Sequence, residues 1–101
     1  MSTNPHNISL QEAEMLTHSY QNSAQFTNQT ISASIDVNSI TQLINQVGCI
    51  GVRFYFSLNT ANKLTLVIVG TDNDNNDILT EIILNKMDLC PPTCVNSPLI
   101  K

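Results

Sequence analysis

Two neighbouring apolar segments, residues 50–57 and 64–69, constrain the fold of this chain more than any other feature of its sequence. In the first segment the side chains alternate with a period of two, which is the pattern of a half-buried strand. The second segment is apolar on both faces, which requires cover on both sides. The Asn-Thr-Ala-Asn sequence at 59–62 is typical of a hairpin loop. An antiparallel hairpin is therefore predicted at the centre of the fold.

Two further strands are predicted around this hairpin. Residues 70–77 are crowded with Asp and Asn, whose side chains stabilise turns by bonding to nearby backbone groups. Residues 78–84 then predict a third antiparallel strand. After Lys86 the chain contains Pro and Cys and is not expected to continue a sheet. Upstream, the alternation over residues 31–36 predicts an earlier strand.

Two helices are predicted before the hairpin. Ser9 begins the first helix, because Glu12 follows three residues later and completes a capping box. The second helix carries an apolar stripe at helical spacing: Ile40, Leu43, Ile44 and Val47. Asp36 or Asn38 can cap its N-terminus, and Gly48 stands where a left-handed C-terminal cap is favoured.

The expected fold class is α+β, with two helices packed on a four-stranded mixed sheet that ends in a three-strand antiparallel meander. The first strand, the second helix and the hairpin form a βαβ-like unit, whose crossover is right-handed if its strands lie parallel. We expect a flexible N-terminal tail over residues 1–8, a single α+β domain over 9–86 and an irregular Pro- and Cys-containing tail over 87–101. A chain of 101 residues is long enough for one such core.

The charge of the chain argues against polyanionic partners. Its net charge is −4, and its cationic residues are Arg53, Lys63, Lys86 and Lys101. Nucleic-acid binding requires clustered cations that neutralise phosphates, and an anionic membrane surface requires the same. Neither nucleic acid nor a membrane is therefore an expected partner.

The N-terminal sequence has neither the basic nor the apolar region of a secretory signal. The apolar runs are also too short to span a bilayer. The default compartment is therefore the cytoplasm, and export without a cleavable signal, as part of a larger assembly, remains an alternative.

The Asp- and Asn-rich segment 72–77 is the first candidate for chemistry. Alternate oxygen-bearing side chains suit a hard cation such as calcium, and the candidate ligands are Asp72, Asp74, Asn76 and Asp77. An EF-hand loop starting at Asp72 would need Gly and Glu where this chain has Asp77 and Ile83. A solvated hairpin turn is the main interpretation, and a low-affinity calcium site is the alternative.

The second candidate is the segment Cys90-Pro91-Pro92-Thr93-Cys94. Zinc is not expected here, because a zinc site usually needs four ligands and no second cysteine pair follows. Redox motifs place two residues between their cysteines, whereas three intervene in this chain. A pair of structural thiols and a Cys90–Cys94 disulfide remain open as alternatives, and no cofactor is expected.

The sequence contains no catalytic constellation, so a conventional enzyme is not expected. Its carboxylates show no pairing pattern for acid–base chemistry, and no Gly-rich phosphate loop occurs. Cys49 has no base nearby in the sequence, since both histidines lie in the N-terminal region.

Arg53 is the only arginine and lies in the middle of a predicted strand among aromatic residues. It is expected either to pair with Glu81 or stack on Tyr55, or to anchor an interface. If Val52, Phe54 and Phe56 face the core, apolar side chains remain on the opposite face and favour self-association. The candidate interface residues are Arg53, Tyr55, Val67, Val69 and Ile83.

Residues 48–56, 64–72, 76–77 and 90–94 carry a resemblance to known sequences. With its Gly-Val-Arg-x-Tyr strand and its Cys-Pro-Pro-x-Cys tail, the chain resembles, from residue 30 onward, a set of short uncharacterised proteins of Bacteroidota-type bacteria. No activity is attached to that set, so the resemblance implies only a compact, non-secreted bacterial protein.

Together these features favour a non-enzymatic interaction or assembly protein, either a homo-oligomer or a small subunit of a larger bacterial complex. The expected partner is protein, in the first place a second copy of the same chain. The alternative is a small metal- or ligand-binding module that uses the Asp/Asn-rich segment or the Cys-Pro-Pro-Thr-Cys tail.

Overall fold

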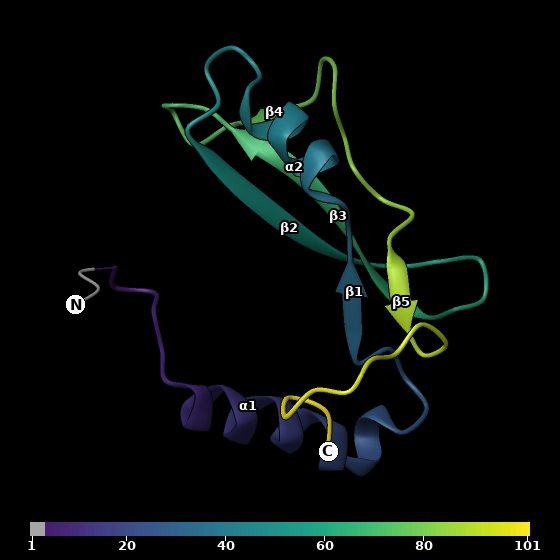
Figure 1. Cartoon of the computed structure of the whole chain (residues 1–101). Coiled ribbons are helices and arrows are strands. Elements are labelled where there is room, and N and C mark those ends of the chain that lie inside the picture. The colour runs from purple at the N-terminus through teal and green to yellow at the C-terminus, as the bar shows by residue number, and fades with distance from the viewer. Residues whose placement is uncertain (1–3) are drawn as a thin grey trace.

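A computed structural model describes residues 4–101 and confirms the α+β class (Figure 1). The helices of this part of the chain are α1 (Leu10–Asn22), a short 3-10 helix (Ala24–Phe26) and α2 (Val37–Ile44). The strands are β1 (Ser32–Ser34), β2 (Gly51–Leu58), β3 (Leu64–Thr71), β4 (Asp77–Ile78) and β5 (Asp88–Cys90). They form two antiparallel sheets, one with the order β2-β3-β4 and one that pairs β1 with β5. Part of the predicted N-terminal tail, residues 1–3, lies outside the described residues.

The predicted hairpin is confirmed as the pair β2–β3. The two strands pair over their whole length, from Gly51 opposite Thr71 to Leu58 opposite Leu64. The Asn59 N–H donates to the Lys63 carbonyl at 2.9 Å and closes the loop between the strands. This long register follows from the period-two pattern of β2, because a slip of one residue would move every side chain to the other face.

The single four-stranded mixed sheet and its βαβ unit are not formed. β1 pairs instead with β5, with Ser32 opposite Cys90 and Ser34 opposite Asp88. Residues 87–101, which were expected to be irregular, therefore supply a strand. This pairing escapes the sequence pattern because β5 is only three residues long and runs directly into prolines.

The predicted third strand, 78–84, is also much shorter than expected. β4 ends at Ile78, and pairing with β3 resumes only at an isolated bridge between Leu84 and Ile68. Between these points the Ile82 N–H donates to the Gln46 side-chain oxygen at 3.2 Å. The backbone of this segment is thus bonded to the loop after α2 instead of to β3.

Both helices begin where their capping residues predict. The Ser9 hydroxyl accepts the Glu12 N–H at 3.0 Å at the start of α1. At the start of α2 an Asp36 carboxylate oxygen accepts the Ser39 N–H at 2.9 Å, and this bond lowers the pKa of Asp36 below its ordinary value. α2 ends at Ile44, one turn earlier than its apolar stripe predicts, so that Val47 projects into solvent.

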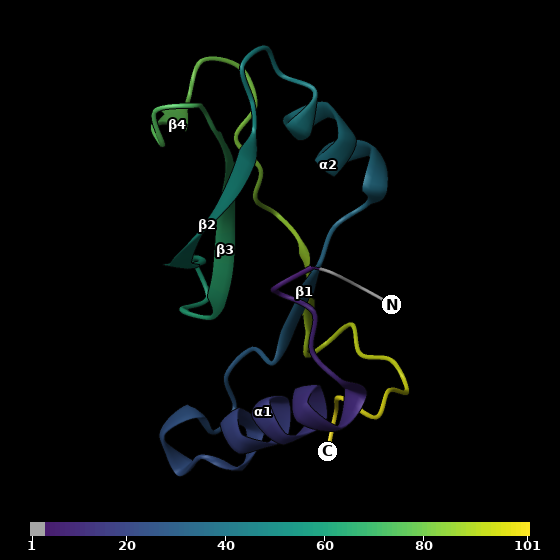
Figure 2. The same cartoon turned by 90° about the vertical axis from the view of Figure 1, so that its left-hand side faces the viewer.

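Only α2 lies against the larger sheet. A Cβ atom added at Gly70 of β3 would lie 2.8 Å from the Cys49 sulfur, so glycine is what allows the loop after α2 to approach the strand. α1 lies at the opposite end of the molecule, beside the C-terminal residues (Figure 2). There the Gln21 side chain donates to the Leu99 carbonyl at 2.9 Å. The prediction that both helices pack on one sheet is therefore wrong for α1.

The described residues enclose a small core and spread over a large volume. The buried hydrophobic residues are Leu43, Ile68, Val69 and Cys90. The radius of gyration is 15.4 Å, whereas a compact domain of this length has about 13 Å. Among the described residues, helices that combine the length and the apolar character needed to cross a membrane are absent.

Several turns of the described chain use left-handed backbone conformations. The non-glycine residues with positive φ are Asn28, Asn62, Asn75 and Lys86, with φ between 58° and 65°. Gly48, after α2, has φ 82° as its predicted capping position requires.

Candidate interaction surface

The two faces of the β2–β3 hairpin differ sharply, because alternate side chains of a strand point to opposite sides. One face, the arginine face, carries Arg53, Tyr55 and Ser57 of β2 together with Thr65, Val67 and Val69 of β3. The other, the phenylalanine face, carries Val52, Phe54, Phe56 and Leu58 of β2 together with Leu64, Leu66 and Ile68 of β3.

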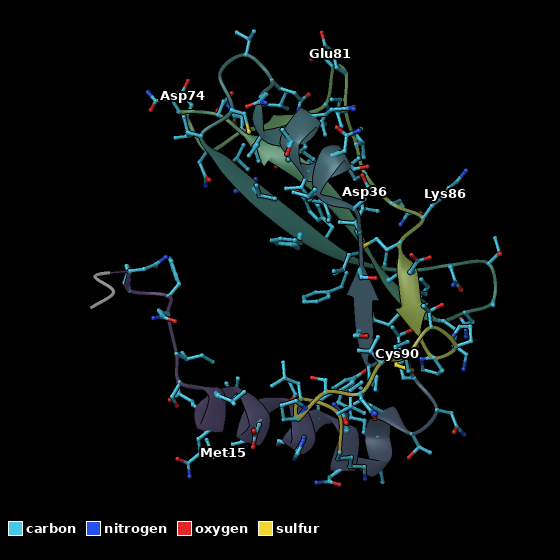
Figure 3. All side chains as sticks on the ribbon, viewed as in Figure 1. Met15, Asp36, Asp74, Glu81, Lys86 and Cys90 are labelled. Carbon is cyan, nitrogen blue, oxygen red and sulfur yellow. A yellow bond between two sulfur atoms is a disulfide. The ribbon has the colours of Figure 1, made fainter. Side chains whose placement is uncertain are left out.

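The arginine face is closed by a polar network within the chain. Arg53 forms an ion pair with Asp77 of β4, and the Tyr55 hydroxyl donates to the other oxygen of the same carboxylate. The Arg53 guanidinium also donates to the Asn75 side-chain oxygen at 2.8 Å. The predicted pairing of Arg53 with Glu81 is therefore replaced by Asp77, while Glu81 lies on the loop after β4 and points outward (Figure 3).

The members of this network stabilise one another's ionisation states. Donation by Tyr55 lowers the pKa of the Asp77 carboxyl, and the Arg53 guanidinium acts in the same direction. The bond to Asp77 in turn raises the pKa of Arg53 and the pKa of Tyr55. At neutral pH the network therefore holds an ionised Asp77, a charged Arg53 and a neutral Tyr55.

The residues predicted for an interface do not form one accessible patch. The Arg53 and Tyr55 side chains reach from β2 across β3 to β4, and Val69 lies on β3 directly opposite Arg53, with only 2% of its surface exposed. Val67 is half-buried, and Ile83 is exposed on the loop after β4. The arginine face therefore offers little apolar surface to a partner.

The phenylalanine face, by contrast, is open along β2. Phe54 and Phe56 have 54% and 80% of their surface exposed, and Val52 and Leu58 are exposed beside them. The condition that Val52, Phe54 and Phe56 face the core is thus met only in part: Ile68 on the same face is buried, but these three side chains of β2 remain exposed. The reason is that the loop after α2 covers only the Gly70 end of this face, while α1 lies with the C-terminal residues.

A small apolar recess adjoins this face next to Phe56. Its volume is ≈ 170 Å³, and Tyr20, Ala33 and Leu66 contribute to its walls. Pockets for small organic ligands usually measure about 300–1,000 Å³. The recess is therefore smaller than an ordinary ligand pocket and continues the apolar surface around Phe56.

The Asp/Asn-rich segment 72–77 forms the turn between β3 and β4. One Asp72 carboxylate oxygen accepts the N–H groups of Asp74 and Asn76, both at 2.9 Å, and Asp77 belongs to the network with Arg53. These bonds are those of a turn in which Asp organises the nearby backbone. In residues 4–101 the structure brings together no group of three or more His, Cys, Asp or Glu side chains that could hold a metal ion.

Cys90 and Cys94 are joined by a disulfide, which is one of the two alternatives that their spacing allows (Figure 3). The bond closes a tight turn directly after β5, with 4.8 Å between the two Cα atoms. Within the same turn the Thr93 N–H donates to the Leu89 carbonyl at 2.8 Å. Cys49 is a free, half-buried thiol whose sulfur lies 3.3 Å from the Gly51 carbonyl oxygen.

No protein-family model matches the chain, and it has no significant match among curated proteins or solved structures.

Proposed function

We propose that this chain is a non-enzymatic assembly protein that associates with further copies of itself through the phenylalanine face of β2, as a homo-oligomer or as a small subunit of a larger bacterial complex. The observation that carries this proposal is the uncovered row of large apolar side chains along that strand. Scattered exposed hydrophobic residues are normal, whereas a contiguous row of them marks an interaction surface.

The total surface of the chain supports association. The chain exposes 7583 Å², whereas a compact monomer of 11.1 kDa exposes about 5,700 Å². The excess of about 1,900 Å² per chain is in the range that each partner buries in an obligate homodimer, where the two partners together bury about 2,000–5,000 Å². Association that covers part of this surface would bring the exposed area of each chain closer to that of a compact protein.

The chemistry of the phenylalanine face also fits a second copy of the chain. The face carries no charged residue among Val52, Phe54, Phe56 and Leu58, and interface cores are depleted in charge and enriched in aromatic residues. Complete burial of one Phe side chain contributes about 1.5–3 kcal/mol. The two phenylalanines alone therefore supply several kcal/mol to association without any ion pair.

Light scattering coupled to size-exclusion chromatography tests the proposal. The unaltered protein is expected to elute as a defined oligomer at micromolar concentration. Phe56→Ser is expected to weaken association by about 10–100-fold, since it removes most of the transfer free energy of one buried aromatic side chain. Because this side chain is largely exposed in the single chain, the fold itself should be retained.

Two leucines of almost equal exposure provide the matched control. Leu58 lies on the phenylalanine face with 60% of its surface exposed, and Leu79 lies beyond β4 with 58% exposed. Leu58→Ser should weaken association, whereas Leu79→Ser should leave it unchanged. A monomer at high micromolar concentration, or equal effects of the two leucine substitutions, would contradict the proposal.

A further inference from the structure

The outer edge of β2 is the longest free strand edge in the described part of the chain. In the order β2-β3-β4, β2 is bonded only to β3, and its eight residues run without a break in the pairing register. The opposite edge strand, β4, has two residues, and β1 and β5 have three each. A free edge presents unpaired N–H and C=O groups, which can bond to another strand.

The register shows which backbone groups of β2 point outward. The Asn59 N–H bonds to the Lys63 carbonyl, so the hydrogen-bonded pairs of the hairpin fall at the odd-numbered residues of β2, including Arg53 and Tyr55. The N–H and C=O groups of the alternate residues therefore point away from β3. These alternate residues are Val52, Phe54, Phe56 and Leu58, which also form the phenylalanine face.

This edge lacks the features by which proteins protect free strands. Protected edges carry Lys, Pro, an inward-pointing charge or a bulge within the strand. β2 contains neither Lys nor Pro, and its one charged side chain, Arg53, leans across β3 to Asp77. Val52, Phe54, Phe56 and Leu58 thus carry both the outward backbone groups, which point away from β3 in the plane of the sheet, and exposed side chains, which stand on one face of it.

We infer that the edge of β2 pairs antiparallel with β2 of a second copy around a two-fold axis, so that the two larger sheets become one continuous sheet. This inference rests on the proposed self-association and adds a backbone contact to it, since the pairing places the two phenylalanine faces side by side on the same surface of the continuous sheet. A two-fold axis gives both copies the same contacts, so the self-complementary edge needs no second surface.

The outward groups also select the register of this pairing. Residues whose backbone N–H and C=O groups point outward must lie opposite one another in the two copies. All four such residues of each β2 are paired when Phe54 of one copy faces Phe56 of the other. This register gives about eight hydrogen bonds between the copies, two for each pair of facing residues. Because directly opposite residues share a face, it also merges the two phenylalanine faces into one aromatic cluster.

The arginine face accepts the same register without opposing like charges. Tyr55 lies on the two-fold axis, opposite its own copy, and Arg53 lies opposite Ser57 of the second chain. Like charges directly opposite each other would destabilise a strand pair, and this register contains none. The polar network around Asp77 can therefore remain intact in the dimer.

Cysteine cross-linking tests the register in a Cys49→Ser background, which removes the free thiol. Across the axis the two Cα atoms at position 55 would lie about 4.5 Å apart, a separation that a disulfide can bridge. At position 57 the two copies would lie about 13 Å apart along the strands. Under mild oxidation the Tyr55→Cys variant should form covalent dimers, whereas the Ser57→Cys variant alone should not. A mixture of the Ser57→Cys and Arg53→Cys variants should form covalent dimers, because these two positions lie opposite each other in the proposed register.

Amide hydrogen exchange tests the pairing on the unaltered protein. In the oligomer the N–H groups of Val52, Phe54, Phe56 and Leu58 should exchange with solvent at least 100-fold more slowly than those of an unpaired strand. The N–H groups of β2 that bond to β3 should be protected from exchange in the same way. Two outcomes would overturn strand pairing while leaving self-association in place. One is an oligomer in light scattering whose outward N–H groups exchange freely with solvent, and the other is cross-linking of Ser57→Cys as readily as of Tyr55→Cys. A monomeric unaltered protein would instead overturn the proposed function, and the strand pairing with it.

Discussion

The two ends of this molecule are stabilised in different ways. The hairpin body, formed by α2 and β2–β4, contains three of the buried hydrophobic residues, Leu43, Ile68 and Val69. The terminal arm, formed by α1, β1, β5 and the residues after β5, contains only Cys90. In place of a core, the arm has the Cys90–Cys94 disulfide and hydrogen bonds between α1 and the C-terminal residues.

This difference shows how a small chain can order residues that it cannot bury. Apolar burial stabilises the body, whereas a covalent bond and helix capping restrict the arm. Neither end covers Phe54 and Phe56, which remain more than half exposed, so we propose that association covers them. If the two ends depend on different interactions, a substitution at one end should leave the stability of the other end unchanged.

The largest effect is expected in the body, from Leu43→Ala. Leu43 is fully buried in a core with very few members, and removing such a side chain leaves a cavity and costs about 2–5 kcal/mol. Urea denaturation measures the loss, and Leu79→Ala is the control because more than half of that leucine is exposed. A loss below about 1 kcal/mol for Leu43→Ala would mean that burial does not stabilise the body.

A smaller effect is expected in the arm, from Cys94→Ser. A disulfide that closes a loop of about five residues stabilises a fold by about 2 kcal/mol. Hydrogen exchange should show faster exchange in β1 and β5 with unchanged protection in β2 and β3, and reductant should have the same effect on the unaltered protein. Equal loss of protection at both ends would show that the arm and the body unfold as one unit.

The network on the arginine face predicts a dependence of body stability on pH. The folded-state pKa of Asp77 lies below its ordinary value of 3.8, so the stability that its ionised form contributes is present above pH 3.8 and is lost as the pH falls through the lowered pKa. The folded-state pKa of Tyr55 lies above 10.0, so the stability of its neutral form is present below pH 10.0 and is lost as the pH rises through the raised pKa.

Asp77→Asn isolates this contribution. The difference in denaturation midpoint between the unaltered protein and the variant should be largest between pH 4 and pH 10 and should shrink on both sides. Asp74→Asn is the control, since the Asp74 carboxylate lies at the tip of the same turn (Figure 3). A difference that is independent of pH would exclude ionisation of Asp77 as its cause.

The smallest effect is expected at the start of α1. Ser9→Ala removes the cap at Glu12 and should cost about 1 kcal/mol of helix stability. Ser19→Ala, in the interior of the same helix, should slightly raise helicity because Ala has the higher propensity. Circular dichroism and exchange of the α1 amides measure both changes, and equal responses would show that capping does not determine the order of the arm.

The sequence predicts those parts of the structure that depend on local patterns. The capping residues Ser9 and Asp36 mark the helix starts, and the hairpin register follows from the alternation in β2. These signals depend on residues within a few positions of one another, so a single sequence contains all of the information. The α+β class follows from them.

The contacts between distant segments could not be predicted in the same way. The partner of β1 is a strand of three residues next to prolines, and the turn after that strand is closed by a disulfide whose formation the spacing left open. For Arg53, the sequence places an acidic partner on a neighbouring strand but does not distinguish Asp77 from Glu81. The exposure of Phe54 and Phe56 could not be predicted because the pattern of a strand shows that its two faces differ, but not how much of each face the rest of the chain covers.

The turns of the chain contain positions at which a substitution to glycine is expected to raise stability. A non-glycine residue in the left-handed region costs about 1–2 kcal/mol, and this cost is smallest for Asn. The chain has three glycines, and it places Asn28, Asn62, Asn75 and Lys86 at such positions instead. Replacing Lys86, the least suited of these residues, by glycine would offset a destabilising change elsewhere. Since folded proteins lie close to a stability threshold, such substitutions would let the chain tolerate changes in its apolar surface without losing the fold.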